Sequence, residues 1–297
     1  GECERTDALT LDEVLRCGQG AVDLVSRARL GGRATQGGLV SAQRMDRRAG
    51  ARGVVSHKNS KSKLDFGLLV HKATPVDARM HARLNVAQTS RELAKAGLLF
   101  GTAGNVSVLF DGPTGAEVAI TATGAELATA EAEHVSVLSL AGEHLDGDLK
   151  ATSEAELHLG LLRERGGAVV HTHSTIATAL SLVLDELPCV HYQQLTLGGS
   201  IRVAPFAVFG SAKLADAVHS AMEGKQAAIL ANHGTVATGH DLAQAQANAE
   251  LLEWAADLYW RARAIGEPRT LSEAQQIAVI EAALSSGYGT TQKVDNS

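Results

Sequence analysis

Hydrophobic positions recur along the chain with two different periods, and together these periods predict an α/β protein. A spacing near 3.6 residues predicts helices, and the first clear example has Leu84, Val86, Leu93 and Ala96 in register. Short apolar runs between turn residues predict strands. The predicted helices cover residues 81–98, 154–163, 175–184, 211–222, 241–265 and 272–284, and the predicted strands cover residues 105–110, 118–121, 168–173 and 227–231. Helices and strands alternate, but the short strands beside turns also allow antiparallel pairing.

The first 75 residues differ from the remainder. Residues 10–30 fit one amphipathic helix, whereas residues 31–63 are rich in Gly, Arg, Ser and Lys and predict loop or disorder. The segment carries 13 Lys and Arg against 8 Asp and Glu, a net of +5, which leaves −11 for the rest because the whole chain carries −6. We interpret residues 1–75 as a basic, flexible extension and residues 76–297 as one catalytic domain. The extension could contact a partner or be a solvated tail.

Composition excludes several classes of protein. With 297 residues, 45% of them hydrophobic, the chain can bury a substantial core. The net charge of −6 argues against nucleic-acid binding. We expect no membrane-spanning helix, because no run of 18 apolar residues occurs, and no secretory signal, because the N-terminus lacks an apolar core. Three cysteines without paired spacing indicate neither a disulfide framework nor a thiolate metal site. A cytoplasmic location fits best.

The strongest local signal is a His-x-His pattern at the end of a predicted strand. Side chains alternate along a strand, so His171 and His173 point the same way and could ligate one cation. His233 is the best third ligand, because it ends the apolar strand 227–231 and is followed by the permissive Gly234. Three protein ligands with an open position are typical of catalytic sites, and nitrogen ligands favour Zn²⁺, with Mn²⁺, Co²⁺ or Fe²⁺ as alternatives. A polar strand face without metal is the competing interpretation.

Seven short motifs occur in one order between about residues 80 and 290, and together they are far more specific than any one alone. They are Gly104-Asn105-Val106-Ser107, Thr121-Ala122-Thr123-Gly124, Thr152-Ser153-Glu154, His171-Thr172-His173, His191-Tyr192, Phe209-Gly210-Ser211 and Asn232-His233-Gly234. In these motifs the chain resembles the class II aldolase/adducin family, specifically its fuculose-phosphate aldolase type. The resemblance implies a three-layer α/β fold with a central, mainly antiparallel sheet flanked by helices. It also implies a homotetramer with active sites between subunits. Residues 1–75 have no counterpart in it.

The resemblance further implies a zinc-dependent aldehyde-lyase of carbohydrate metabolism. Such an enzyme reversibly cleaves a ketose 1-phosphate to dihydroxyacetone phosphate and an aldehyde through a metal-stabilised enediolate. His171, His173 and His233 then hold the metal, and Glu154 is both an exchangeable ligand and the general base. From its position alone, Glu154 could equally be a helix-start glutamate favoured by the helix dipole.

The resemblance places the substrate phosphate among small polar residues. These candidate binding residues are Asn105, Ser107, Thr123, Gly124, Thr152 and Ser153. Hydroxyls, an amide and a helix N-terminus supply neutral donors for such an anion, although ordinary capping and turn roles would use the same residue types. The chain departs from the family at Ala122, where a proline is usual.

Two tyrosines complete the predicted active site. Tyr192 follows His191 as in the aldolases, and Tyr288 matches the C-terminal catalytic tyrosine. A phenol can donate a proton to the oxygen of the aldehyde fragment. An epimerase of the family usually carries an aspartate soon after the position of His191, where this chain has Tyr192, Gln193 and Gln194, and this favours aldol cleavage over epimerisation. A decarboxylase tends to carry lysine beside the base, where this chain has Ser153. A dehydratase and a non-catalytic adducin-like module are further alternatives, but the module predicts degraded metal ligands.

Overall fold

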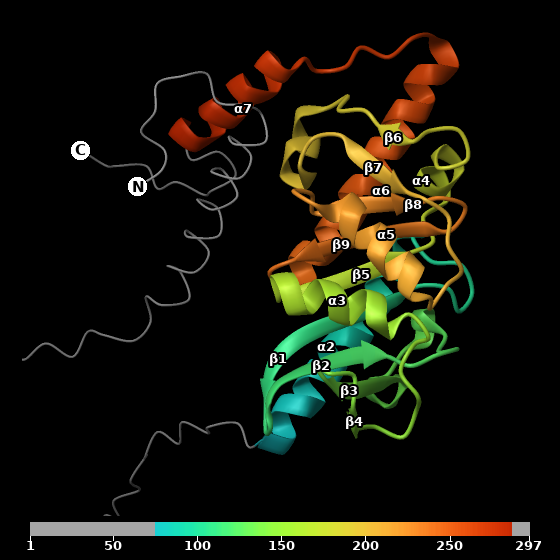
Figure 1. Cartoon of the computed structure of the whole chain (residues 1–297), viewed down its shortest axis with the longest axis vertical. Helices are drawn as coiled ribbons and strands as arrows, with labels where there is room; N and C mark the ends of the chain where they lie inside the picture. Colours follow the sequence, from blue (N-terminus) through green and yellow to red (C-terminus); the bar gives the residue numbers. More distant parts are fainter. Residues whose placement is uncertain (1–74, 287–297) are drawn as a thin grey trace, which may run out of the picture. The chain divides into compact units, whose positions relative to one another are not determined.

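The structure, a computed structural model, describes residues 75–286 (Figure 1). The predicted N-terminal extension therefore lies outside the described residues as far as position 74, and so does Tyr288. None of the described helices combines the length and the apolar character that crossing a membrane requires.

The described residues form a nine-stranded sheet in the order β4-β3-β2-β1-β5-β9-β8-β7-β6. Neighbouring strands pair antiparallel, except that β7 and β8 are parallel. The strands are β1 (Asn105–Gly112), β2 (Gly115–Thr121), β3 (Val135–Ser139), β4 (His144–Asp146), β5 (Ala168–Thr172), β6 (Glu186–Leu187), β7 (Ile201–Ala204), β8 (Ala227–Leu230) and β9 (Gly234–Gly239). β5 thus lies in the middle of the sheet, between β1 and β9.

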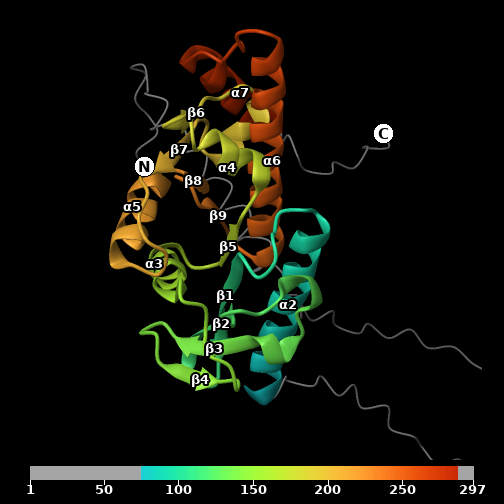
Figure 2. The same ribbon diagram turned by 90° about the vertical axis from the view of Figure 1, so that its right-hand side faces the viewer.

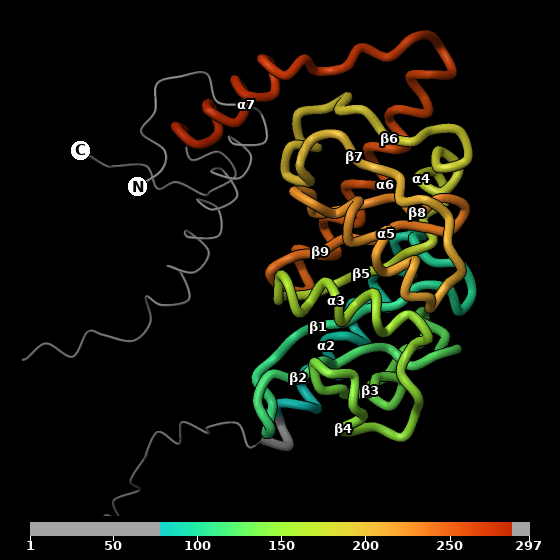
Figure 3. The backbone as a smooth tube through the Cα atoms, in the orientation of Figure 1, coloured from blue at the N-terminus to red at the C-terminus, as the bar shows by residue number. Residues whose placement is uncertain are grey.

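Helices cover both faces of this sheet, which gives three layers (Figure 2). One face carries α2 (Pro75–Lys95), α4 (Thr175–Leu180) and α6 (Leu242–Ile265), and the other carries α3 (Ala155–Arg165) and α5 (Ala212–Met222). Short 3-10 helices are η1 (Leu127–Thr129), η2 (Ala132–His134) and η3 (Tyr192–Leu197). The chain then runs from α6 into α7 (Glu273–Ser286), which contacts η3 (Figure 3). The expected three-layer fold with a mainly antiparallel sheet is confirmed.

Side chains of β5 alternate between the two helix layers that cover the sheet. Ala168 and Val170 pack in the hydrophobic cluster beside α2 and α6, whereas Val169 packs in the cluster beside α3 and α5. His171 has the same parity as Val169, so it projects toward the face that carries α3. A polar residue at this fully buried position needs partners within the protein.

Some element boundaries differ from the predicted ones for local reasons. The first helix begins at Pro75, a residue that suits a first helical turn. It ends at Lys95 rather than Leu98, because Gly97 adopts a φ of 78° and the Leu98 amide bonds back to the Leu93 carbonyl at 3.1 Å. The predicted helix 175–184 ends at Leu180, where the Ser181 hydroxyl donates to the Thr178 carbonyl.

Candidate metal centre

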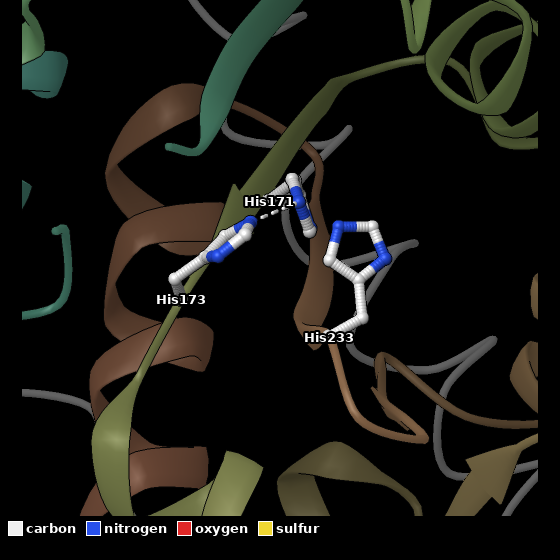
Figure 4. Close-up of side chains that lie close together, drawn as sticks. All are labelled: His171, His173 and His233. Atoms are coloured by element: carbon white, nitrogen blue, oxygen red, sulfur yellow. Dashed lines mark hydrogen bonds between the residues drawn. The ribbon is translucent and has the colours of Figure 1, made fainter. Parts of the chain in front are cut away.

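The junction between β5 and β9 brings three histidines together (Figure 4). His171 lies within β5, His173 follows that strand directly, and His233 lies in the turn between β8 and β9. The ring centroids are 4.9–5.0 Å apart. One nitrogen from each ring lies within 4.8 Å of the others, and the Nε2 atoms of His171 and His173 are 3.1 Å apart. We call these three residues the histidine cluster.

The backbone around His233 is adapted to this convergence. A Cβ atom at Gly234 would lie 2.2 Å from the Thr172 carbonyl oxygen and 3.3 Å from both His171 and His173. Only glycine therefore lets β9 approach the ligand strand so closely. Before His233, Asn232 adopts a φ of 58°, and its backbone N–H donates to the Ser181 hydroxyl at 3.0 Å.

Hydrogen bonding fixes how His171 presents its ring. Its Nδ1 lies 2.9 Å from the Thr235 carbonyl oxygen, which can only accept, so Nδ1 carries the proton and Nε2 faces the cluster with a lone pair. Burial lowers the pKa of His171, and burial together with the other two cluster histidines lowers the pKa of His173 to about 4. The imidazoles of His171 and His173 are therefore neutral at pH 7, which is the state that binds a metal ion.

Glu154 adds a carboxylate to the histidine cluster. Its Oε2 lies 3.3 Å from His171 Nε2, and its Oε1 lies 3.6 Å from His233 Nε2. Burial alone would raise the pKa of this carboxyl, but the attraction of His171 and a hydrogen bond from Asn105 outweigh burial and hold the pKa below its ordinary value. Although Glu154 occupies the N-cap position of α3, its side chain makes no capping hydrogen bond. The carboxylate of Glu154 therefore contacts the histidine cluster and does not cap the helix.

These four side chains match the requirements of a divalent cation. Across residues 75–286, Glu154 Oε1 is one of the few buried side-chain atoms that have no hydrogen-bond partner. Tetrahedral ligands about 2.0–2.1 Å from a zinc ion would lie roughly 3.3 Å from one another, close to the 3.1 Å between His171 Nε2 and His173 Nε2. Imidazole nitrogens and an ionised carboxylate that converge on one point thus fit a cation.

The loops predicted to bind phosphate lie side by side next to Glu154. An isolated bridge joins Ala122 to Ala151, and the Thr123 amide donates to the Lys150 carbonyl at 2.9 Å. Thr123, Gly124 and Ser153 are exposed, whereas Thr152 is buried. The Ala122 amide donates to the His134 carbonyl at 2.8 Å, a bond that proline could not make. The departure from the family pattern therefore adds a backbone hydrogen bond to this loop.

Two of the predicted binding residues point into the protein. Asn105 is buried and its amide nitrogen donates to Thr152 Oγ1 at 3.1 Å and to Glu154 Oε2 at 3.0 Å. Ser107 is fully buried, and its hydroxyl lies 2.7 Å from Nδ1 of His158. His158 is not among the candidate site residues named from the sequence. Its distance of one helical turn from Glu154 is the signal that could have singled it out.

The tyrosine that the sequence singled out within the described residues lies on η3. The Tyr192 ring lies 4.6 Å from that of His191, which in turn contacts Trp254 of α6 at 4.9 Å, and 39% of Tyr192 is exposed. Tyr259 on α6 packs against the hydrophobic core instead.

Comparison with known proteins adds the family to this geometry. The family model described as Class II Aldolase and Adducin N-terminal domain matches residues 84–260. The 5-deoxy-D-ribulose 1-phosphate aldolase of Bacillus thuringiensis serovar kurstaki is 37% identical, over 64% of this chain and 90% of that protein. The 3-oxo-tetronate 4-phosphate decarboxylase of Haemophilus influenzae is 38% identical, over 59% of this chain and 85% of that protein.

Among solved structures, an L-fuculose 1-phosphate aldolase matches with a TM-score of 0.64 and 29% identity. The match covers 69% of this chain and 96% of the aldolase. The ordered motifs, the observed sheet and the matched family model agree, and the chain belongs to the class II aldolase and adducin family.

Proposed function

We propose that this protein is a cytoplasmic, zinc-dependent aldolase that reversibly cleaves a ketose 1-phosphate into dihydroxyacetone phosphate and an aldehyde. The observation that carries the proposal is the contact of the Glu154 carboxylate with the histidine cluster. Within residues 75–286, Oε1 of this carboxylate has no hydrogen-bond partner. A base beside a cation site is what proton transfer at a carbon next to a carbonyl needs. The aldolases among the relatives support the same reaction class.

The cation would be held by the histidine cluster, with Glu154 as an exchangeable fourth ligand. The imidazole nitrogens favour Zn²⁺, and Mn²⁺, Co²⁺ or Fe²⁺ are the alternatives. When bound, a divalent cation supplies a Lewis acid that stabilises negative charge on the substrate oxygens during cleavage.

Glu154 would serve as the base of the reaction. Cleavage breaks the bond between the carbon beside the ketone and the hydroxyl-bearing carbon that becomes the aldehyde. The hydroxyl loses its proton as it becomes the aldehyde carbonyl, and the electron pair of the broken bond moves toward the ketone. The carbon left behind takes a proton to give dihydroxyacetone phosphate. The ionised, buried Glu154 can exchange that proton, because none of the described residues forms a competing hydrogen bond with its Oε1.

The phosphate would bind where the two exposed loops meet the start of α3. Thr123, Gly124 and Ser153 are accessible there, and Thr152 lies beneath them. The free amides of a helix N-terminus favour an anion at this place. Asn105 and Ser107 belong to the same predicted set, but both side chains are buried.

In the condensation direction, the phenol of Tyr192 or Tyr288 would donate a proton to the oxygen of the aldehyde fragment, and in cleavage it would take back the proton that the hydroxyl loses. Tyr192 lies on η3, whereas the histidine cluster lies at the ends of β5 and β8. We propose that a homotetramer completes the active site between subunits, so that these phenols reach the substrate across the subunit boundary.

The proposal is tested by supplying the zinc-loaded protein with a panel of ketose 1-phosphates, including 5-deoxyribulose 1-phosphate, and measuring aldehyde release. Exchange of carbon-bound protons of dihydroxyacetone phosphate with D2O measures the base directly. Glu154→Gln is expected to retain zinc and to slow exchange roughly 100- to 10,000-fold. The decarboxylase relative makes release of CO2 from 3-oxo-tetronate 4-phosphate the control reaction. CO2 release without aldehyde release or proton exchange would contradict the aldolase.

A further inference from the structure

Four buried side chains form a continuous hydrogen-bonded chain that ends on the proposed base. Ser107 Oγ lies 2.7 Å from His158 Nδ1, and His158 Nε2 lies 2.5 Å from Asn105 Oδ1. Asn105 Nδ2 then donates to Glu154 Oε2 at 3.0 Å. Ser107 and His158 have no exposed surface, and Asn105 and Glu154 are at most 7% exposed. We call this arrangement the buried relay.

The chemistry of the groups fixes the direction of every hydrogen bond in the relay. The Asn105 amide must turn its NH2 group toward Glu154, because the reverse orientation would place a carbonyl oxygen against a carboxylate. Its Oδ1 then faces His158 Nε2, which must carry the proton. Burial lowers the pKa of His158 to about 3, so the ring is neutral at pH 7. The remaining nitrogen, Nδ1, therefore accepts from the Ser107 hydroxyl, and all donors of the relay point toward the carboxylate.

Two regular spacings place these residues opposite each other. Asn105 and Ser107 are two apart on β1 and share one face of that strand. Glu154 and His158 are four apart at the start of α3, which packs against β1. Asn105 is also the direct partner of His171 in the pairing of β1 with β5. The relay thus ties the helix that carries the base to β1, the strand that pairs with β5 beside His171.

The relay occupies the polar atoms of Asn105. One N–H bond of the amide serves Thr152 Oγ1 and the other serves Glu154 Oε2, while Oδ1 accepts from His158. A direct contact between Asn105 and a phosphate would require one of these bonds to break. Glu154 is held by its Oε2, and its Oε1 remains directed at His233 without a hydrogen-bond donor.

We propose that His158 is a positioning residue: supported by Ser107, it locks the Asn105 amide so that Glu154 is held by Oε2 and presents Oε1 to the cation and the substrate carbon. This inference rests on the proposed role of Glu154 as the base. It assigns to Asn105 and Ser107 a function in orienting the carboxylate. A merely structural buried histidine would affect stability without a selective effect on turnover.

Three substitutions at His158 separate these roles. His158→Gln retains an N–H group near the position of Nε2. His158→Asn retains a polar amide group only near the position of Nδ1, and His158→Leu retains no polar group at either position. Leu159→Ala is the matched control, because Leu159 is a fully buried neighbour on the same helix that packs in the hydrophobic core.

The measurement is kcat, KM and proton exchange on dihydroxyacetone phosphate with the zinc-loaded full chain. His158→Leu and His158→Asn are expected to lower kcat roughly 10- to 100-fold while KM changes less than about threefold. His158→Gln is expected to recover kcat to within about fivefold of the wild type, and Leu159→Ala to lower Tm with kcat nearly unchanged. Equal losses in all three His158 variants that follow their Tm values would overturn the proposal.

A spectroscopic readout keeps this inference separable from the proposed function. Long-range ¹H–¹⁵N NMR of the zinc-loaded chain, with His158 assigned by comparison with His158→Gln, reports which ring nitrogen is protonated. The neutral tautomer protonated at Nε2 is expected at pH 7, and a ring protonated at Nδ1 or at both nitrogens would overturn the relay. Absence of exchange in the wild type, with the tautomer as expected, would instead remove the proposed function.

Discussion

The histidine cluster and the buried relay meet at Glu154, but their imidazole rings differ in hydrogen bonding. In the relay, both ring nitrogens of His158 have a hydrogen-bond partner. In the cluster, His171 has a partner at Nδ1, but its Nε2 faces the Nε2 of His173 and an oxygen of Glu154. Burial lowers the pKa values of His158, His171 and His173, so these three rings are neutral at pH 7. An imidazole with both nitrogens hydrogen-bonded can orient a neighbouring side chain. Imidazole lone pairs that converge beside a carboxylate instead form a site suited to a cation.

The largest effect that separates the two regions is expected from Gly234→Ala. The added Cβ would lie 2.2 Å from the Thr172 carbonyl oxygen, so β9 and the His233 turn must move away from β5. We expect zinc affinity to fall roughly 100-fold, while the relay, which lies on β1 and α3, keeps its hydrogen bonds. Gly160→Ala is the matched control, because no atom lies within 4 Å of a Cβ built there. Calorimetric zinc titration measures both variants, and an unchanged affinity in Gly234→Ala would show that the close approach does not position the cluster.

A smaller effect is expected when the pH is lowered, and it depends on His158 of the relay: acid should reduce the stability of the folded chain. The folded chain keeps His158 neutral down to about pH 3, whereas the unfolded chain protonates it below the ordinary histidine value of 6.5. Between these values the unfolded state binds more protons, so the free energy of unfolding falls as the pH is lowered. From pH 7 to pH 5, the protonation of this one residue in the unfolded state should lower the free energy of unfolding by about 2 kcal/mol.

Urea unfolding of the zinc-free chain at both pH values measures this loss. His158→Gln cannot titrate, so its loss of stability over the same interval should be smaller by about 2 kcal/mol. His173 contributes alike to both chains and cancels from the difference. The same pH dependence in both proteins would mean that His158 is not held neutral by the fold.

The smallest effect is expected at the turn that carries His233. Asn232 adopts a φ of 58°, which asparagine tolerates better than most residues and glycine adopts freely. Asn232→Ala should therefore lower the free energy of unfolding by about 1 kcal/mol, and Asn232→Gly should change it by less than about 0.5 kcal/mol. Both variants keep the backbone N–H that donates to the Ser181 hydroxyl. Equal stabilities of the two variants, measured by urea unfolding, would argue against backbone strain at this turn.

The sequence predicted the parts of this molecule that have a regular pattern. The apolar runs at residues 168–173 and 227–231 became β5 and β8, and the His-x-His spacing correctly placed two rings on one side. The strand β9 was not predicted, because Gly-Thr-Val-Ala-Thr-Gly offers little hydrophobic contrast although all six residues are buried. β3, β4, β6 and β7 were missed as well, since short strands gain their order from neighbouring strands that a local pattern does not include.

The relay shows why the site itself was only partly predictable. Asn105 and Ser107 were recognised as polar residues of one motif, but their direction depends on α3 packing against β1, which no local spacing reveals. His158 carried a usable signal in its separation from Glu154. That signal acquires meaning only when the partner strand is known, because an (i, i+4) pair on a helix is common on any buried face.

The most direct test of the histidine cluster is the zinc content of the full chain, measured by elemental analysis after dialysis against dilute zinc, for the wild type and His171→Ala in parallel. We expect about one zinc ion per chain in the wild type, and a loss of nearly all bound zinc in His171→Ala, because the variant removes the central, fully buried ligand. Full zinc occupancy in His171→Ala, or no binding by the wild type, would contradict the assignment of this cluster as the metal centre.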